Sequence, residues 1–235
     1  LRLVAGADID IFLLQRHSVI DHQVRDLIEQ HGIEQIVELA SGLSPRGYRI
    51  KQQYPHIRYI EGDLPGMAAR KRELLGRVGL AAGHDVVECN ILQEDGPTSI
   101  AAVLASLDTS KPTLIITEGL VNYFDLPVIR SVWARMAQGL KRFPQGYYIT
   151  DLYPDFADHP SYRYVKMAQK LVGLFTRGQW PLHYSNDNAI RNGFGEDGFD
   201  QVDVLDPASF YGQLNLPEVK IKTLVRIIRC KVSGE

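Results

Sequence analysis

The sequence predicts an α/β protein built on a doubly wound, mostly parallel sheet. Short apolar segments alternate with longer segments that have the spacing of amphipathic helices, as in consecutive βαβ units. The apolar segments are continuous, which is typical of parallel strands covered on both faces. The chain has 235 residues, 45% of them hydrophobic and 23% charged. This suffices for one domain with a full core, and we expect residues 1–235 to form it.

The first half of the chain shows the alternation most clearly. We expect a helix at residues 18–31, with Ser18 as its N-cap and Gly32 as its end, inside an N-terminal helical segment at residues 1–34. The next expected strands are 36–39, 57–60, 85–92 and 112–117, and the next expected helices are 45–54, 67–78 and 99–107. Right-handed crossovers would place these helices on both faces of the sheet.

The second half begins regularly, with a long amphipathic helix at 126–142 and a fifth strand at 147–152. The pattern then loosens between residues 153 and 197, where one helix-like stretch, 162–176, lies among prolines, aromatics and histidines. We expect this insertion to cover a pocket, with a purely structural elaboration as the alternative. Strands at 201–205 and 219–232 complete a seven-stranded sheet, and we expect the last to pair antiparallel at an edge.

Composition excludes several classes of function. The formal net charge of -2 gives no electrostatic reason to expect nucleic acid or an anionic membrane as a partner. We see no apolar run of transmembrane length and no secretory signal, although the sequence begins at Leu1. Cys89 and Cys230 read as buried thiols of a reducing compartment, and no Cys/His cluster has zinc-ligand spacing. We therefore expect a cytoplasmic protein without a metal.

The most informative stretch is Q-I-V-E-L-A-S-G-L-S-P-R, residues 35–46. Its strand gives way to three small residues, Ala40, Ser41 and Gly42, of which glycine has the widest conformational freedom. Pro45 then suits the first turn of a helix. A strand, a tight turn and a helix N-terminus allow backbone N–H groups to approach a ligand, although the same geometry also occurs as a plain connection.

Polar side chains recur where the predicted strands end: Glu38, Glu61, Asp63, Asn90, Glu118 and Asp151. In a doubly wound sheet these ends meet at the ligand-binding edge. Asp63 lies about twenty positions after Gly42, the separation at which a carboxylate accepts from a ribose diol. Only one of the spaced positions Ala40, Gly42 and Ser44 is glycine, and no phosphate loop is present. The turn therefore suits a nucleoside ligand without a phosphate chain.

Four motifs stand in a distinctive order: Arg16 with Ile20-Asp21, V-E-L-A-S-G-L-S-P-R-G at 37–47, E-G-D-L-P at 61–65 with Lys71, and T-E-G-L-V-N-Y-F at 117–124. Together they resemble the leucine carboxyl methyltransferase family. This is a branch of the class I S-adenosylmethionine-dependent methyltransferases that also contains bacterial O-methyltransferases linked to polyketide biosynthesis. The family's usual L-G-x-G-L-D-T-R is replaced here by L-A-S-G-L-S-P-R, which lacks one glycine and one acidic residue.

The resemblance implies a Rossmann-like fold and a site for S-adenosylmethionine. Arg16 would bind the methionine carboxylate, for which a guanidinium fork is suited. Glu118 would lie near the methionine ammonium, and Asp63 would accept from the ribose hydroxyls. The full set of expected cofactor-binding residues is Arg16, Glu38, Ala40, Ser41, Gly42, Asp63, Leu64, Asn90, Ile91, Glu118 and Tyr123.

Within this set, the resemblance assigns Asn90 and Ile91 to the edge and face of the adenine. Tyr123 would help to form the wall of the methyl-transfer site. For Glu38 we favour a role in holding the turn, with direct cofactor contact as an alternative.

The implied reaction is an in-line attack of a substrate oxygen on the sulfonium methyl group, in which positioning and desolvation carry most of the catalysis. A carboxylate acceptor needs no base, whereas a phenol or alcohol does. The candidate bases are Tyr153, Asp155, His159, His183 and Tyr184, and none is preferred. We favour a small, polyketide-type acceptor. The alternatives are a protein C-terminal carboxylate as acceptor, a non-catalytic binding module, and a nicotinamide-dependent oxidoreductase.

Overall fold

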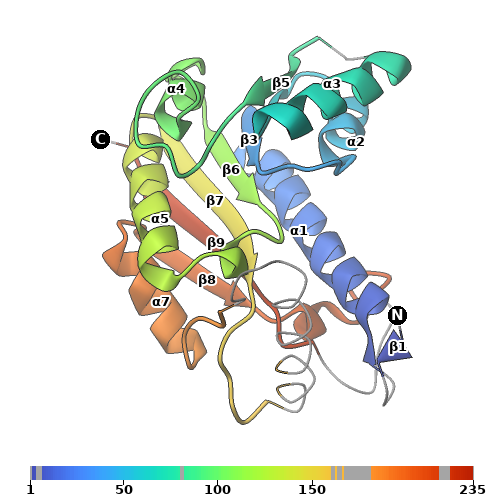
Figure 1. Ribbon diagram of the computed structural model, residues 1–235, viewed down its shortest axis with the longest axis vertical. Coiled ribbons are helices and arrows are strands. Elements are labelled where there is room, and N and C mark those ends of the chain that lie inside the picture. The colour runs from blue at the N-terminus through green and yellow to red at the C-terminus, as the bar shows by residue number, and fades with distance from the viewer. Residues whose placement is uncertain are drawn as a thin grey trace.

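A seven-stranded sheet lies between two layers of helices in the computed structural model (Figure 1). The structure describes residues 2–3, 7–79, 82–159, 162, 166, 181–216 and 223–234. The strands, in the order in which they lie in the sheet, are β5 (His84–Glu88), β4 (Arg58–Asp63), β3 (Gln35–Leu39), β6 (Thr113–Thr117), β7 (Gln145–Leu152), β9 (Arg226–Ser233) and β8 (Gln201–Leu205). The first five are parallel, and β9 runs antiparallel to both its neighbours. The predicted α/β fold is confirmed.

Each face of the sheet is covered by its own set of helices (Figure 1). One face carries α1 (Ile9–His31), α2 (Arg46–Gln53) and α3 (Pro65–Val78), and the other carries α4 (Ile100–Ala105), α5 (Leu126–Leu140) and α7 (Asp187–Glu196). Strand β3, with the sequence Q-I-V-E-L, has consecutive apolar residues that are buried on opposite faces of the sheet. Ile36 packs with Leu27 of α1, whereas Val37 belongs to the opposite cluster, which contains Trp133 of α5. Burial on both faces therefore replaces the alternating pattern of a half-exposed strand.

The order of the strands determines where a ligand can approach. The chain passes from β3 to β4 and β5, then returns to β6 on the other side of β3. Such a reversal leaves a crevice beyond the carboxyl ends of the two central strands, where ligands of doubly wound proteins bind. Two features predicted to bind a ligand lie at this crevice: the turn after β3, and Glu118, which follows β6.

The N-terminal predictions need two corrections. Helix α1 begins at Ile9, so Ser18 lies inside it rather than capping it, and Arg16 is a helical residue. No glycine or proline occurs between Ile9 and Ser18 to end a helix there, so the pattern extends further back than the capping signal suggested. The segment 1–34 is also not wholly helical, because β1 (Arg2–Leu3) and β2 (Ala7–Asp8) pair ahead of α1.

The C-terminal strands lie differently from the prediction. Strand β9 is antiparallel as expected, but β8 lies outside it at the edge of the sheet. The burial pattern gives the reason: Ile227 and Ile228 of β9 belong to the clusters on opposite faces, whereas Gln201 and Asp203 of β8 are exposed. A strand covered on both faces belongs inside the sheet, and a partly exposed polar strand suits its edge.

The segment predicted to cover a pocket is only partly described. The expected helix at 162–176 lies outside the described residues, apart from Tyr162 and Lys166, which are both helical. The last part of the 153–197 segment contains α7, which does not cover a pocket, because Ile190 and Phe194 pack into the core beside the sheet. The sequence prediction missed this helix. Asn186, whose side chain accepts from the Ala189 N–H, supplies a regular N-cap.

The described residues also include two short 3-10 helices. The first, η1 (Val121–Tyr123), follows β6 and lies at the ligand-binding edge of the sheet. The second, η2 (Pro207–Phe210), follows β8 and packs through Phe210 into the cluster that contains α1.

Candidate functional site

The predicted order of strand, tight turn and helix is present after β3. The difference from the prediction is that Ala40, and not only Gly42, has a positive φ. Gly42 has a φ of 51°, and Ala40 also has a φ of 51°, in the region that favours glycine. The Gly42 N–H donates to Asp63 Oδ2 (2.7 Å), and the Ser41 N–H donates to the Gly62 carbonyl (3.3 Å). The turn is thus attached to the end of β4 rather than shaped by its own residues alone.

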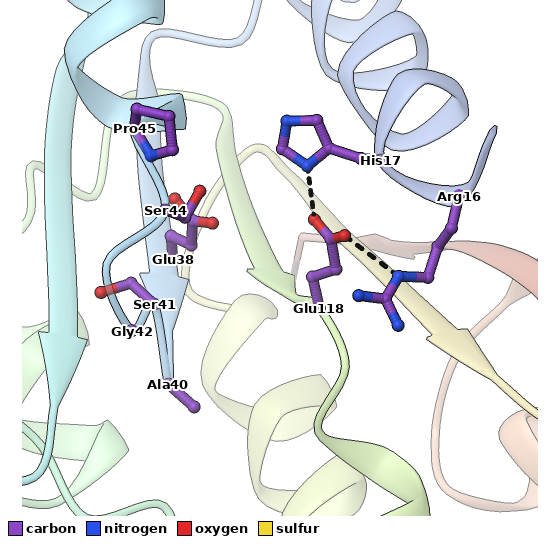
Figure 2. Close-up of a pocket in the computed structure, with 9 residues that line it drawn as sticks. All are labelled: Arg16, His17, Glu38, Ala40, Ser41, Gly42, Ser44, Pro45 and Glu118. Carbon is purple, nitrogen blue, oxygen red and sulfur yellow. Dashed lines mark hydrogen bonds and ion pairs between the residues drawn. The ribbon is translucent and has the colours of Figure 1, made fainter. Parts of the chain in front are cut away.

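A cavity of about 370 Å³ lies between this turn, the end of β6 and helix α1 (Figure 2). Its volume falls within the range of roughly 300–1,000 Å³ usual for small-molecule sites. In Figure 2, Arg16 and His17 reach toward Glu118 from α1, and the turn lies across from them. The lining residues are Arg16, His17, Glu38, Ala40, Ser41, Gly42, Ser44, Pro45 and Glu118.

Two carboxylates hold Arg16 at the cavity. Its Nε donates to Glu118 Oε1 (3.0 Å) and its Nη1 donates to Asp151 Oδ2 (3.3 Å). The other Asp151 oxygen accepts from the Gly119 N–H (2.6 Å). Gly119 has a φ of 68°, and a Cβ there would lie 3.3 Å from Arg16 Nη2. Both the backbone conformation and the nearby guanidinium therefore favour glycine after Glu118.

A second arginine lies beneath the cavity and connects three elements. The Arg46 side chain is fully buried, and its guanidinium donates to Asp21 Oδ1 (2.6 Å), to Glu38 Oε1 (2.5 Å) and to Glu118. The other Glu38 oxygen accepts from the Tyr59 hydroxyl (2.7 Å). Arg46 therefore ties α1, β3 and the end of β6 to the start of α2, and Glu38 holds the turn through it.

The surroundings of Glu118 keep it ionised. Burial acts to raise the pKa of this carboxyl group, but the hydrogen bond from His17 and the charges of Arg46 and Arg16 outweigh burial and hold the pKa well below its usual range. His17 Nδ1 lies 3.1 Å from Glu118 Oε2. The cavity therefore keeps a permanent anion beside the Arg16 cation at neutral pH.

The structure brings six of the eleven predicted residues together around the cavity: Arg16, Glu38, Ala40, Ser41, Gly42 and Glu118. Asp63 and Leu64 adjoin the turn, where Asp63 accepts hydrogen bonds from the Gly42 and Leu64 N–H groups. Ile91 is buried in the core, Asn90 Oδ1 accepts from the Leu92 N–H, and Tyr123 is exposed on η1. Contact of these residues with a cofactor stays a prediction.

The sequence prediction missed four residues of this region. His17, Ser44 and Pro45 line the cavity, and Arg46 lies below it. Ser44, Pro45 and Arg46 all belong to the motif after β3, so their place in the sequence was a usable signal. For His17 the signal was weaker, because its approach to Glu118 depends on α1 crossing the end of β6.

Burial shifts the pKa values of three of the five candidate bases. Burial raises the pKa values of Tyr153 and Tyr184 to about 12, so both phenols stay protonated at neutral pH. Burial instead lowers the pKa of His183, and its Nε2 has no hydrogen-bond partner in the part of the chain that the structure describes. Asp155 accepts from the Tyr162 hydroxyl (2.6 Å), and the His159 N–H donates to the Phe156 carbonyl. His183 is therefore a neutral imidazole.

The described ranges contain neither a candidate metal cluster nor a membrane-spanning helix. Within them, no three His, Cys, Asp or Glu side chains form a group that could hold a metal ion. The helices described there also lack the combination of length and apolarity that a membrane span requires. Cys89 and Cys230 are free and buried.

Comparison with known proteins places the chain in a family. The sequence model described as "Leucine carboxyl methyltransferase" matches residues 5–137, more than half of the 235 residues. The chain belongs to the leucine carboxyl methyltransferase family. The resemblance drawn from the four motifs is thereby confirmed, and all four lie within the matched residues.

Curated relatives of this family member come from mycobacteria. It is 39% identical over 94 residues to a "Putative S-adenosyl-L-methionine-dependent methyltransferase" of Mycolicibacterium paratuberculosis, a match that covers 39% of this chain and 29% of the relative. A similarly named protein of Mycolicibacterium smegmatis is 33% identical over 119 residues, which is 50% of this chain and 39% of that protein. The chain thus covers less than half of either relative.

Solved structures show the same fold at low sequence identity. A "putative methyltransferase" from Thermobifida fusca YX has a TM-score of 0.69 and 17% identity, covering 94% of this chain and 81% of that one. Human N-acetylserotonin methyltransferase, solved in complex with SAM, has a TM-score of 0.60 and 12% identity, covering 95% and 55%. These likenesses establish that the family member has a Rossmann-like methyltransferase fold.

Proposed function

We propose that this family member binds S-adenosylmethionine in the cavity beyond β3 and β6 and transfers its methyl group to an oxygen of a small molecule. The ion pair of Arg16 and Glu118 at the cavity is the observation that carries the proposal. A cation and an anion held side by side are complementary to the carboxylate and ammonium of an amino acid. The names of the mycobacterial relatives support the same cofactor.

The chemistry of the cavity fits this cofactor. The connected charges are three guanidinium groups and four carboxylates: Arg16, Arg46, Arg49, Asp21, Glu38, Glu118 and Asp151. Burial raises the pKa values of Glu38 and Asp151, whereas Glu118 is held ionised, so the charges that line the cavity are the Arg16 cation and the Glu118 anion. S-adenosylmethionine carries one net positive charge from its sulfonium, ammonium and carboxylate groups. The Arg16 cation and the Glu118 anion are complementary to its carboxylate and its ammonium, and this effect is strongest where water is excluded.

The Ser41 hydroxyl adds a second sign of fit. It belongs to a residue that lines the cavity, it is buried, and within the described residues it has no hydrogen-bond partner. Buried polar groups are usually paired, so an unpaired hydroxyl at a cavity supports the presence of a polar ligand.

The bound cofactor supplies a methyl group already activated by the sulfonium, so the chain has to orient the acceptor oxygen and exclude water. A carboxylate acceptor would react directly. A hydroxyl acceptor, such as the phenol of a polyketide-type metabolite, would need a proton acceptor, and none of the five candidate bases is among the residues that line this cavity.

The alternative of a non-catalytic binding module was suggested by the missing family glycine. Ala40 nevertheless adopts the left-handed conformation that a glycine would take, and the Asp63–Gly42 hydrogen bond is in place. The turn is thus formed and attached to β4 with alanine at position 40, so the missing glycine is not by itself a reason to infer a degenerate site.

Calorimetric titration with S-adenosylmethionine, S-adenosylhomocysteine and NAD tests the proposal. We expect micromolar binding of the two sulfur ligands and none of NAD. Arg16→Gln should weaken both by about tenfold to a hundredfold, the effect of losing a charged hydrogen-bond donor. Arg58→Gln, at an exposed ion pair near the start of β4, is the control and should bind as wild type. Absence of binding by either sulfur ligand would contradict the proposal.

A further inference from the structure

A second buried group of charges lies outside the cavity, between β4, β5 and α3. Glu61 is 0% exposed and forms an ion pair with Lys71, which is 3% exposed. His84 Nε2 lies 3.0 Å from the other Glu61 oxygen, and His84 is 4% exposed. None of the three lines the cavity, so the proposed function gives them no role.

Stability alone is a poor explanation for this group. Removing two charges from water is costly, and well-packed apolar residues of similar volume often serve as well as a buried ion pair. The space is also tightly specified, because a Cβ at Gly47 of α2 would lie 2.0 Å from Glu61 Oε1. The arrangement also requires a glycine within helix α2, and glycine in a helix is itself destabilising.

Lys71 also contacts the turn after β3. Its Nζ donates to the carbonyl oxygen of Ser41 (3.4 Å). The same oxygen accepts the Ser44 N–H (3.1 Å), and the Ser41 N–H donates to the Gly62 carbonyl. The peptide groups on both sides of Ser41 are therefore fixed from outside the turn. This matters because Ala40, one residue earlier, has a backbone conformation that its side chain disfavours.

We infer that Lys71 is a positioning residue for the cofactor site: its ammonium group fixes the Ser41 carbonyl, and its contact with Glu61 holds that ammonium in place. The inference rests on the proposed function, because it assigns Lys71 an effect on cofactor binding. A purely structural ion pair would affect stability without this specific effect on binding.

Three variants separate positioning from stability, with S-adenosylhomocysteine as the calorimetric probe and thermal unfolding measured in parallel. Lys71→Met leaves Glu61 buried without its cation, so it should lower both stability and affinity. Glu61→Gln keeps an oxygen that accepts from Lys71, so its affinity should stay within about twofold of wild type. Lys71→Met/Glu61→Gln removes the pair together and should recover stability, while its affinity stays about tenfold weaker.

The outcomes separate a failure of the inference about Lys71 from a failure of the proposed cofactor binding. If wild-type protein binds no S-adenosylhomocysteine, the proposed function fails. If wild type binds and the double variant binds equally well, only the role of Lys71 fails. Should both Lys71 variants prove unfolded, the ammonium resonance of Lys71 in wild-type protein gives the answer: titration with S-adenosylhomocysteine should shift it, and an unmoved signal would overturn the inference.

Discussion

Replacing Arg46 by methionine removes the cation at the centre of the charge cluster below the cavity. The side chain is fully buried, and it pairs with Asp21, Glu38 and Glu118. Glu38 is itself buried and would retain the Tyr59 hydroxyl as a hydrogen-bond donor. Loss of one partner from a buried pair costs about 3–5 kcal/mol, because a charge is left uncompensated in a poorly solvated place. We expect a loss of this size in the free energy of unfolding.

Thermal unfolding and urea denaturation at neutral pH measure this loss. A change of about 3–5 kcal/mol corresponds to a melting temperature lower by roughly 6–20 °C in a protein of this size. Arg49→Met is the matched control. Arg49 also pairs with Asp21 (2.7 Å), but its side chain is 48% exposed, so the expected cost is below about 1 kcal/mol. The reasoning is refuted if Arg46→Met is as stable as this control.

The effect of Arg46 should also depend on pH, with a sign that follows from Glu118. Arg46 is one of the groups that hold the pKa of Glu118 below its usual range in the folded protein. Because the pKa of Glu118 is lower in the folded protein than in the unfolded chain, ionised Glu118 stabilises the fold above its unfolded pKa of about 4.3. This stabilisation is lost as the pH falls toward the folded pKa of Glu118. The difference in stability between wild type and Arg46→Met should therefore be largest above about pH 5 and should shrink in acid.

Substitutions at four glycine and alanine positions give further predictions. Gly47→Ala should destabilise the fold by about 1–3 kcal/mol in urea denaturation, because the new methyl group meets Glu61 at 2.0 Å, whereas Gly76→Ala on α3 meets nothing and should stabilise by about 0.5–1 kcal/mol. Ala40→Gly should leave stability unchanged or raise it by up to about 1 kcal/mol, since it relieves a φ of 51°, and a clear loss would contradict this. Gly119→Ala should weaken S-adenosylhomocysteine binding at least about tenfold in calorimetry, because it strains the backbone and crowds the guanidinium of Arg16; wild-type affinity would count against that geometry.

Those parts of the fold that were predicted correctly are the parts in which local sequence and burial agree. Strand β3 is an example: all five of its residues are buried, so its apolar run has a single interpretation. The start of α1 was wrong because Ser18 is a good cap in isolation, yet nothing before it stops a helix. Helix α7 was missed because Gly193 and Gly195 weaken its local signal, while packing of Phe194 against Trp133 stabilises it.

The residues of the candidate site also fall into two groups, those that the sequence indicated and those that it did not. Arg16, Gly42 and Glu118 were found because a motif or a strand end marks them in the sequence. His17 and Arg46 were not assigned roles, since their partners are distant in the chain: Arg46 meets Asp21, 25 residues earlier, and Glu118, 72 residues later. Long-range pairing of buried charges depends on how helices cross a sheet, which local patterns do not specify.

The turn after β3 has a left-handed backbone conformation at position 40, where alanine replaces the family's usual glycine. A glycine at position 40 would adopt a φ of 51° without strain, and alanine adopts it at a cost of about 1 kcal/mol. That cost is comparable to the net contribution of one hydrogen bond. The turn receives external contacts from Asp63, Gly62 and Lys71, all of which belong to β4 or α3. The shape of the ligand-binding turn is therefore specified mainly by its neighbours, so we expect substitution of Asp63 to damage the site more than the natural loss of the glycine has done.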